Sequence, residues 1–568
     1  MEDSTARKHP KGLPFLFFTE MWERFGYYLM LGILFLYMTD TERNGLGFDS
    51  KTAADIFGTF IAMVYLTPFI GGMLADRLIG YRLSVNIGCV LMGLGYLGLA
   101  IPDFFGIQEE SVQLITFYSS LGMIIIGTGF FKANISTLLG NLYSEDKYRA
   151  YKDTGFNIFY MGINIGAFIC NFFGAYLRNT FTWGHAFAAA GIGMFAALIF
   201  FLLGDKHYRH ADVRKPARPG EAGLGSVLSI IMIPAVMAGI AGWLLPPLFA
   251  GNPEFTVFGS HSTDAFLFGC LPILVYFINL YRTSTAEDKR PIGALLAIMG
   301  VVVIFWAVFK QNGTALTLWA ENYTDRELPA AIAPATETLG MVKKVTTETK
   351  EVPAYDALFR APKDEKGKVI TKQDVTPYLN NLPKEKWPQE GKSLSLISTE
   401  LFQSINPFFV IVLTPIVIAF FSMLRRRNRE PSTPAKIAWG LVISACSTLV
   451  MVAAAIYSHN GAEKSSAWWL VGTYAVITAG ELFLSPMGLS LVSKLSPPRI
   501  AALMMGAWSL STSIGNKLSG VLASMWDGYD NKQYFFLVNF GLLMFAALGI
   551  FLMLPWLRRI INEHTPKT

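Results

Sequence analysis

Fourteen long apolar runs constrain the fold of this 568-residue chain more than any other feature. Each is close to the roughly 20 residues that an α-helix needs to cross a membrane. A transmembrane β-barrel would show short segments of alternating polarity instead, so we predict an all-α polytopic membrane protein. The runs lie at 13–38, 53–75, 83–101, 112–138, 155–176, 185–204, 225–248, 265–281, 291–319, 397–424, 434–457, 467–493, 500–525 and 534–557.

The composition excludes an ordinary soluble enzyme and a disordered chain. Only 15% of the residues are charged, against about 25% in soluble domains, and the mean hydropathy is +0.40. No metal-ligand spacing, nucleophile–base pair or phosphate-binding loop occurs at membrane depth. We therefore expect no enzyme activity, no metal and no nucleic-acid partner. Four cysteines lie singly in apolar runs, as small packing residues: Cys89, Cys170, Cys270 and Cys446.

The distribution of lysine and arginine predicts the orientation. Basic residues gather in alternate connections, of which 425–429 is the densest, while the intervening short loops carry few. Cytoplasmic loops carry this excess, so we expect both termini in the cytoplasm. The first apolar run contains Glu20, Glu23 and Arg24 and ends in no small-residue cleavage site, so it does not resemble a cleavable signal peptide.

Two insertions interrupt the pattern of spans. The runs 225–248 and 265–281 form a hairpin with few ionisable residues, which we expect at the periphery. The polar stretch at about 321–394 is expected on the outer side and is too long for a plain loop. Its sequence is compatible with a small folded cap and with a mobile segment.

The first span carries the densest set of ionisable groups at membrane depth. Such charges are costly in lipid and must face protein or a watery cavity. Steps of four, three and four place one set on a single helix face: Glu20, Arg24, Tyr27 and Leu31. Glu23 and Tyr28 flank this face. Two acids beside one arginine leave a surplus that can hold an exchangeable proton; the alternative is a static ion network between helices.

Two further charges lie on other spans. Lys132 is deep in the fourth run and Glu481 is the lone acid of the twelfth. Together with Arg24 they would form a cavity suited to a zwitterion, whose carboxylate meets the cations and whose ammonium meets the acid. The alternatives are a lysine that reaches back to the membrane interface and an acid near a helix end.

Amides and aromatic residues complete the candidate cavity. Asn164 and Asn406 can hydrogen-bond a peptide group or an amine, although ordinary hydrogen bonds between helices are an alternative. Tyr27, Tyr28, Tyr65, Trp306 and Trp508 can line side-chain pockets or can simply pack.

Several motifs resemble one transporter family. GGMLADRLIG, with Asp76 and Arg77, resembles the loop between helices two and three of the major facilitator superfamily. EMWERF (20–25) resembles the ExxERF signature of its proton-coupled oligopeptide transporters, the POT/PTR family. FYMGINIGA (159–167) resembles that family's second signature. The likeness extends to YLTPFIGGMLADRLIG, FWAVFKQNG, FQSINP, GELFLSPMGLSLVSKLSP and MGAWSLSTSIGN, and leaves out only the 321–394 insertion.

The resemblance implies two six-helix bundles, 1–204 and 291–568, joined by a linker and peripheral hairpin at 205–290, as in bacterial members with fourteen helices. It implies a symporter of the bacterial inner membrane that imports di- and tripeptides with protons by alternating access. It implies no cofactor besides the coupling protons and no required protein partner.

The positional match also implies roles for single residues. Arg24 and Lys132 would bind the peptide carboxylate, and Asp76 and Arg77 would belong to a gating loop. The amino end would meet Asn164, Asn406 and Glu481, and the pocket would be lined by Tyr28, Tyr65, Trp306 and Trp508. The groups implied in proton coupling are Glu20, Glu23, Arg24, Lys132, Lys310 and Glu481.

The sequence departs from the family at an ion pair. Many members have an acid after FWxxF, paired with an arginine seven residues beyond the ExxER arginine. Here these positions are Lys310 and Leu31, and Gly58 stands where animal members have a histidine. The absence of both the acid and the arginine is consistent on electrostatic grounds, because an arginine at position 31 would repel the lysine at position 310. Lys310 can titrate itself, pair with another acid or reach the outer interface.

Two other functions stay open from the sequence. One is transport of another small anion or amino-acid derivative within the same family, against which the intact Arg24, Lys132 and Glu481 argue. The other is a non-transporting membrane peptide sensor, with the 321–394 stretch binding its partner.

Overall fold

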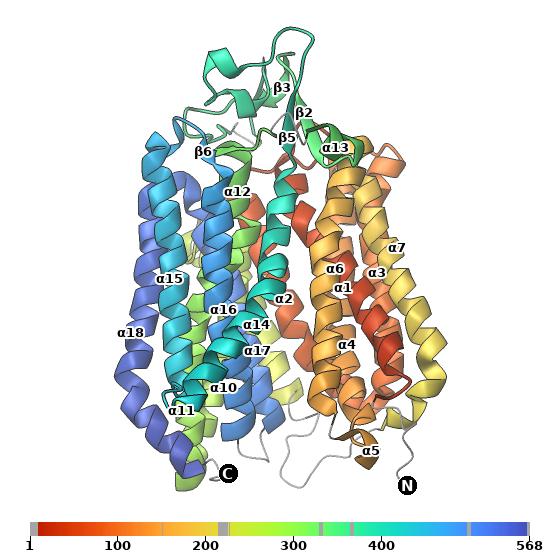
Figure 1. Ribbon diagram of the computed structural model, residues 1–568, viewed down its shortest axis with the longest axis vertical. Coiled ribbons are helices and arrows are strands. Elements are labelled where there is room, and N and C mark those ends of the chain that lie inside the picture. Colours follow the sequence, from red (N-terminus) through yellow and green to blue (C-terminus); the bar gives the residue numbers. More distant parts are fainter. Residues whose placement is uncertain are drawn as a thin grey trace.

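The computed structural model describes residues 9–149, 151–213, 225, 228–328, 333–363, 369–496 and 501–564. Within these residues, twelve helical segments are long and apolar enough to cross a membrane. The more polar helices α1 (Leu13–Thr39) and α17 (Ala501–Ser524) run among them and complete the predicted fourteen. The helices stand side by side as two bundles (Figure 1), which confirms the predicted all-α membrane fold.

The N-terminal bundle contains α1 and five more long helices: α2 (Ser50–Leu74), α3 (Tyr81–Phe104), α4 (Glu110–Leu142), α6 (Lys152–Thr180) and α7 (Trp183–Gly204). The C-terminal bundle contains α17 with α11 (Ala286–Phe309), α14 (Ile405–Arg426), α15 (Thr433–Tyr457), α16 (Ala467–Leu495) and α18 (Lys532–His564). The hairpin between them consists of α9 (Ile233–Ala250), extended by a turn at Leu228–Met232, and α10 (His261–Thr283). Shorter elements are the π-helical turn Ala75–Ile79, the helix α5 (Asp146–Arg149) and single 3-10 turns at Asp205–His207, Arg209–Ala211, His459–Gly461 and Trp526–Gly528.

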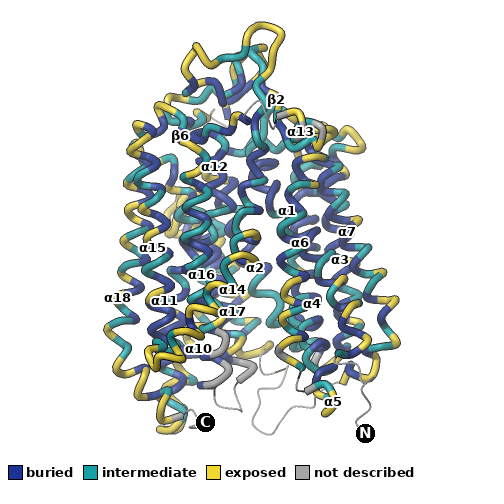
Figure 2. The backbone as a smooth tube through the Cα atoms, viewed as in Figure 1, coloured by how far each residue is buried: buried dark blue, intermediate teal, exposed yellow. Residues whose placement is uncertain are grey.

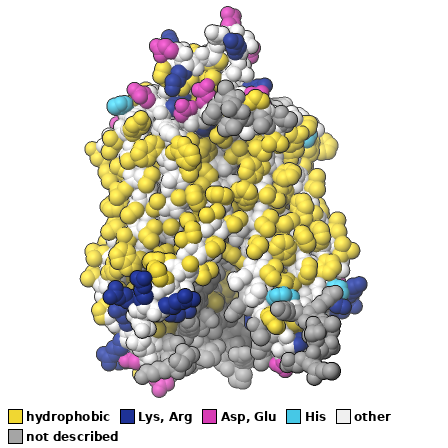
Figure 3. Space-filling view, viewed as in Figure 1, with side chains coloured by type: hydrophobic (Ala, Val, Ile, Leu, Met, Phe, Trp, Pro, Cys, Tyr) yellow, Lys and Arg dark blue, Asp and Glu magenta, His cyan; other side chains and the backbone are white. Residues whose placement is uncertain are grey.

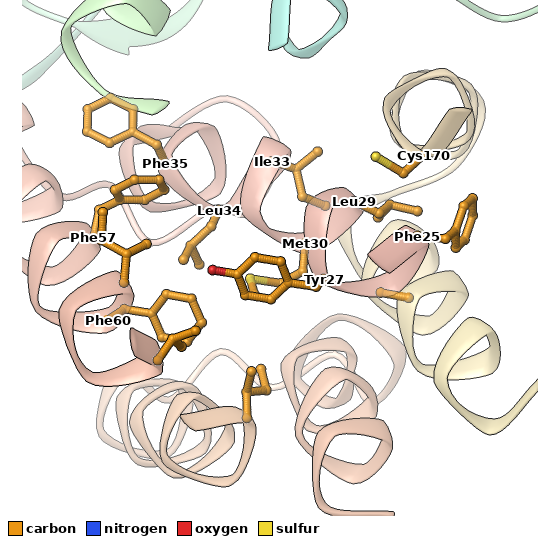
Figure 4. Packing of buried hydrophobic residues seen from close by; sticks show 14 of the residues in the cluster. Phe25, Tyr27, Leu29, Met30, Ile33, Leu34, Phe35, Phe57, Phe60 and Cys170 are labelled. Carbon is orange, nitrogen blue, oxygen red and sulfur yellow. The ribbon is translucent and has the colours of Figure 1, made fainter. Parts of the chain in front are cut away.

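The helices bury apolar faces against one another and leave an apolar band outside. In the N-terminal bundle α1 packs on α6 and α7, and its Phe35 meets Phe57 of α2, ring centroids 6.3 Å apart (Figure 4). Buried segments run along the inside of both bundles (Figure 2), whereas large apolar side chains such as Phe249, Phe545 and Leu552 are exposed. On the face shown in Figure 3 hydrophobic side chains form a broad yellow belt, as a surface in contact with lipid requires.

The two ends of the molecule differ. The first residues of α1 and the last of α18 lie at one end, and the polar insertion covers the opposite end (Figure 1). On the visible face, lysine and arginine side chains gather along the lower edge of the apolar belt (Figure 3). The predicted domain boundaries after residues 204 and 290 remain predictions, and α11 already begins at Ala286.

The predicted ninth span at 291–319 lies within one segment long and apolar enough to cross a membrane, Ala286–Asn322, which is interrupted at Lys310. After α11 the chain makes a 3-10 turn (Lys310–Gly313) and continues as α12 (Ala315–Asn322). Gly313 faces the Phe57 ring, where a Cβ atom would lie 2.5 Å from the ring, and Gln311 Nε2 donates to Asn539 Oδ1 at 3.0 Å. The break therefore places Lys310 at a turn in the middle of the protein.

The insertion folds into a small cap, defined here as residues 323–398. Three two-stranded pairings build it: β1 (Thr324–Asp325) with β6 (Ser465–Ser466), parallel, and two antiparallel pairs, β2 (Val342–Val345) with β5 (Leu394–Ile397) and β3 (Lys350–Pro353) with β4 (Thr371–Asp374). A helix α13 (Ala333–Thr338) and short turns at Pro377–Leu379 and Lys384–Lys386 complete it. Its own apolar core, around Leu379 and Leu396, favours the folded alternative.

Candidate functional site

An ion cluster on α1 forms one wall of the candidate site. Glu20, Glu23 and Arg24 are 5%, 0% and 4% exposed. Arg24 donates from Nη2 to Glu23 Oε1 at 2.6 Å and from Nε to Glu23 Oε2, and its Nε lies 3.4 Å from Glu20 Oε1. Glu20 Oε2 is buried and has no hydrogen-bond partner among the described residues. The cluster thus holds a surplus carboxylate oxygen next to a shared arginine.

Aromatic rings surround the guanidinium group of Arg24. Its Cζ lies 5.1 Å from the Tyr27 ring centroid and 5.9 Å from that of Tyr28. Such cation–π contacts stabilise a desolvated cation. Tyr27 is 2% exposed, whereas Tyr28 is partly exposed. Tyr28 is therefore the ring available to a ligand.

Two lysines from different helices converge on one tyrosine of α2. Lys132 Nζ of α4 lies 3.7 Å from the Tyr65 ring centroid, and Lys310 Nζ lies 5.4 Å from it. Lys310 Nζ is also 5.4 Å from the Trp306 ring. Within the described parts of the chain, no carboxylate oxygen comes within 4 Å of either ammonium group. Lys310 thus turns toward the interior and forms no ion pair there.

Glu481 of α16 is held by an amide of the neighbouring helix α14. Asn406 Nδ2 donates to Glu481 Oε2 at 3.2 Å and to Thr478 Oγ1 at 2.8 Å, which fixes the carboxylate between α14 and α16. Glu481 lies within electrostatic range of Lys310 and of Tyr28. Since Lys132, Lys310, Asn406 and Glu481 are all partly exposed although they lie inside the protein, water reaches them.

Four other residues were predicted for the binding site or for the gating loop. Asn164 Nδ2 donates to Tyr160 O of its own helix at 3.0 Å, and Trp508, 7% exposed, packs on Gly488 of α16. Among the described residues, no contact joins Trp508 to the charged groups, so its predicted contact with a ligand stays a prediction. The side chains of Asp76 and Arg77 fall outside the described part of the structure.

The sequence reasoning missed two ion pairs between the bundles. Arg178 Nη2 of α6 lies 3.1 Å from Glu400 Oε2 in the 3-10 turn (Thr399–Ser404) before α14. Lys517 Nζ of α17 lies 2.6 Å from Asp55 Oδ1 of α2. Asp55 and Lys517 lie within predicted spans, so the rule that a charge at membrane depth needs a partner was the available signal.

Comparisons with known proteins agree with this architecture. The family model described as POT family matches residues 83–343 and 392–537. An uncharacterised transporter of Bacillus subtilis, YclF, is 30% identical over 98% of this chain and 95% of its own length. Peptide transporter YePEPT of Yersinia enterocolitica is 30% identical over 98% of this chain and 96% of its own.

Solved structures match as well. A peptide transporter POT in complex with sulfate superposes with a TM-score of 0.73 at 28% identity, over 97% of this chain and 96% of the other. A POT family transporter in complex with 5-aminolevulinic acid gives 0.71 at 25% identity, over 97% of both chains. The family model covers most of the sequence and the relatives span its whole architecture: the chain belongs to the POT family of membrane transporters.

Proposed function

We propose that this protein is a symporter that moves di- and tripeptides inward with protons by alternating access. The observation that carries the proposal is the convergence of Lys132, from the N-terminal bundle, and Lys310, from the C-terminal bundle, on the ring of Tyr65, with Glu481 within electrostatic range of Lys310. A peptide is a zwitterion of matching polarity. The names of a di-/tripeptide transporter of Lactococcus lactis and of YePEPT support the substrate class.

In this proposal the peptide lies between the bundles. Lys132, with Arg24 behind it, binds the carboxylate, because both come from the N-terminal bundle. Glu481, held by Asn406, receives the peptide ammonium. The rings of Tyr28, Tyr65 and Trp306 line the space between the two ends of the peptide. On the flanking helices, Asn164 would help to bind the amino end and Trp508 would line the pocket. Binding neutralises charges on both bundles, which lowers the cost of closing them over the substrate.

The coupling proton is assigned to the cluster on α1. Arg24 is held by Glu23 through two hydrogen bonds and by Glu20 at 3.4 Å. A proton on Glu20, whose Oε2 lacks a partner among the described residues, or on Glu23 weakens this hold. Arg24 is then free to strengthen binding of the carboxylate, so proton and peptide bind together. The charges of Lys132, Lys310 and Glu481 contribute to proton coupling because they determine how easily the acids of α1 take up the proton.

The test separates proton coupling from substrate binding. Purified Glu20→Gln and Glu23→Gln variants in sealed vesicles should lose accumulation of labelled dialanine under a pH gradient and keep counterflow between two peptide pools. Glu109→Gln, at an exposed position, is the matched control. If both variants still concentrate the peptide, the proton assignment is wrong. If the unaltered protein accumulates no peptide, the proposal of transport fails and a sensor gains support.

The remaining expectations complete the proposal. Both termini lie in the cytoplasm of a bacterial cell, so the cap faces outward. The bundles 1–204 and 291–568 rock about the site, with the hairpin of 205–290 beside them. Asp76 and Arg77 belong to the inner gating loop. Protons serve as the coupling ion, and no cofactor or second protein is needed.

A second candidate rests on the two lysines without a carboxylate partner in the described structure. One neutralises the carboxylate common to all peptides, and the other remains for a second negative charge. This surplus favours acidic peptides, or another small anion with two negative charges. Competition between dialanine and such anions for uptake distinguishes the candidates.

A further inference from the structure

A buried lysine joins the two bundles near the capped end. The side chain of Lys517 on α17 has 0% exposure, and its Nζ lies 2.6 Å from Asp55 Oδ1 on α2. Thr59 Oγ1 accepts a further hydrogen bond from Lys517 Nζ at 2.6 Å. The ion pair lies apart from the residues proposed to bind the peptide, and none of the described ones contacts it. It spans the interface along which the bundles would have to separate.

The peripheral hairpin closes over this ion pair. Three hydroxyl groups at the start of α10 donate to the carboxylate of Asp55: Ser260 at 2.8 Å, Ser262 at 2.5 Å and Thr263 at 3.1 Å. Ser262 Oγ also lies 2.9 Å from Lys517 Nζ. The hairpin was expected to be merely peripheral. It instead contacts both partners of a bond between the bundles.

The helices approach as closely as their backbones allow next to this contact. A Cβ atom on Gly58 would lie 2.7 Å from Gly520 Cα, and one on Gly520 would lie 2.6 Å from Ala54 O. One turn further, Ser513 Oγ donates to Ala62 O at 2.6 Å. This close approach of the two helices brings Asp55 into direct contact with Lys517, and the Asp55 side chain keeps 18% exposure.

A second ion pair joins the two bundles at the capped end, on the other side of the interface. Arg178 and Glu400 are 7% and 0% exposed as side chains and join α6 to the turn before α14. The two pairs therefore hold both edges of the interface, α2 against α17 and α6 against α14. Such contacts must break whenever a rocking transporter opens at this end.

We infer that Asp55 and Lys517, together with Ser260 and Ser262 of the hairpin, form a latch that stabilises the protein closed at the capped end. The inference rests on the proposed alternating access and gives the α9–α10 hairpin a role in it. The latch supplies an ionic contact between the bundles in a chain whose Leu31 and Lys310 cannot pair with each other. Asp55, Lys517 and the hydroxyl groups act by positioning the bundles and do not bind the peptide.

The test measures a distance and needs neither substrate nor a proton gradient. Spin labels are attached through Lys51→Cys and Met525→Cys, both exposed at the ends of α2 and α17, with the exposed Cys446 replaced by serine. The parent protein should give one main distance in lipid. Asp55→Asn and Lys517→Met should each raise the ratio of a longer-distance population about tenfold, as expected for a lost charge-assisted hydrogen bond.

The hairpin is tested with matched serine variants. Ser262→Ala should shift the distances in the same direction by a smaller factor, about threefold. Ser284→Ala, at the other end of α10, where Oγ donates only to Leu280 O, should leave them unchanged. Equal distributions in these two variants would overturn the hairpin's part in the latch.

A charge-reversal variant controls for the possibility that the single substitutions change the distances by unfolding the protein. The double variant Asp55→Lys with Lys517→Asp should recover most of the short distance, because hydroxyl groups can serve either charge. A distribution in Asp55→Asn identical to the parent, or a reversal no better than the single variants, would overturn the latch. Loss of peptide uptake with an intact distance response would count against the proposed function alone.

Discussion

Lys310→Gln tests whether the substituted position selects the substrate. Glutamine removes the charge and keeps a polar group of similar reach. Lys310 Nζ lies 5.4 Å from the Tyr65 ring and 5.4 Å from the Trp306 ring, at the turn between α11 and α12. Lys310 makes no ion pair with any described carboxylate, so its substitution does not leave a buried acid without its ion-pair partner. We expect the variant to fold and to transport neutral dipeptides.

The expected magnitude follows from the contact that is lost. A hydrogen bond to a charged group contributes about 1.5–3 kcal/mol. Two unit charges about 5 Å apart interact by about 3 kcal/mol at an effective dielectric constant of about 20, in agreement. Because about 1.4 kcal/mol is tenfold in affinity, the preference for an acidic over a neutral peptide should fall about 10- to 150-fold. Lys132 keeps the carboxylate common to both peptides.

The assay is competition for uptake of labelled dialanine into sealed vesicles under an imposed pH gradient. Unlabelled alanyl-glutamate and alanyl-glutamine have nearly the same shape and differ by one charge. The ratio of their half-inhibitory concentrations, in the parent protein and in Lys310→Gln, isolates that charge. Lys384→Gln, an exposed lysine of the cap, is the control and should leave the ratio unchanged.

An unchanged ratio in Lys310→Gln would refute the reasoning, since it would mean that the ammonium group does not meet the substrate side chain. A parent protein that prefers the glutamine peptide would refute it as well. A general loss of uptake with an unaltered ratio would assign Lys310 to the transport cycle instead.

Three further predictions concern packing, the cap and a surface ion pair. Gly58→Ala forces a Cβ atom to 2.7 Å from Gly520 Cα and should cost about 1–3 kcal/mol, seen as a lower Tm in detergent. Arg326→Ala removes a 1% exposed side chain that donates to Ile397 O at 2.9 Å; the cap should lose protection in hydrogen exchange while the helices keep theirs. Hydrogen bonds from Arg425 and, to a smaller extent, Lys436 lower the pKa of the Glu430 carboxyl from 4.5 to about 2. The contact therefore stabilises the fold, by at most about 1 kcal/mol, above pH 4.5 and loses this as the pH falls toward 2; NMR titration of the labelled carboxyl should show the low midpoint, and Arg425→Gln should raise it.

The spans and the candidate site could be predicted because membrane helices obey a local rule. A run of apolar residues long enough to cross the bilayer needs no partner to be identified. A charge within such a run must face protein, which singled out Glu20, Arg24, Lys132 and Glu481. The structure packs α1 against α4 and places Glu481 of α16 within electrostatic range of Lys310 and Tyr28, and two lysines contact the ring of Tyr65.

Some residues escaped this reasoning because their roles depend on partners far along the chain. The sequence left open whether Lys310 titrates, pairs with another acid or reaches the outer interface, whereas the structure places it in a 3-10 turn next to Tyr65 and Trp306. The predicted contact of Asn164 with a ligand stays a prediction, since the structure shows only that its Nδ2 donates to Tyr160 O of its own helix. Local spacing does not reveal which neighbour a side chain meets.

The sequence by itself determined the membrane-crossing segments, the lipid-facing composition and which charges had to be kept away from lipid, since hydropathy and helix periodicity act over a few turns. Only the tertiary structure decided how the shelter is built: the folded cap, the turn at Lys310, and the ion pairs Asp55–Lys517 and Arg178–Glu400. These contacts join residues hundreds of positions apart, and their geometry exists only once both bundles have packed.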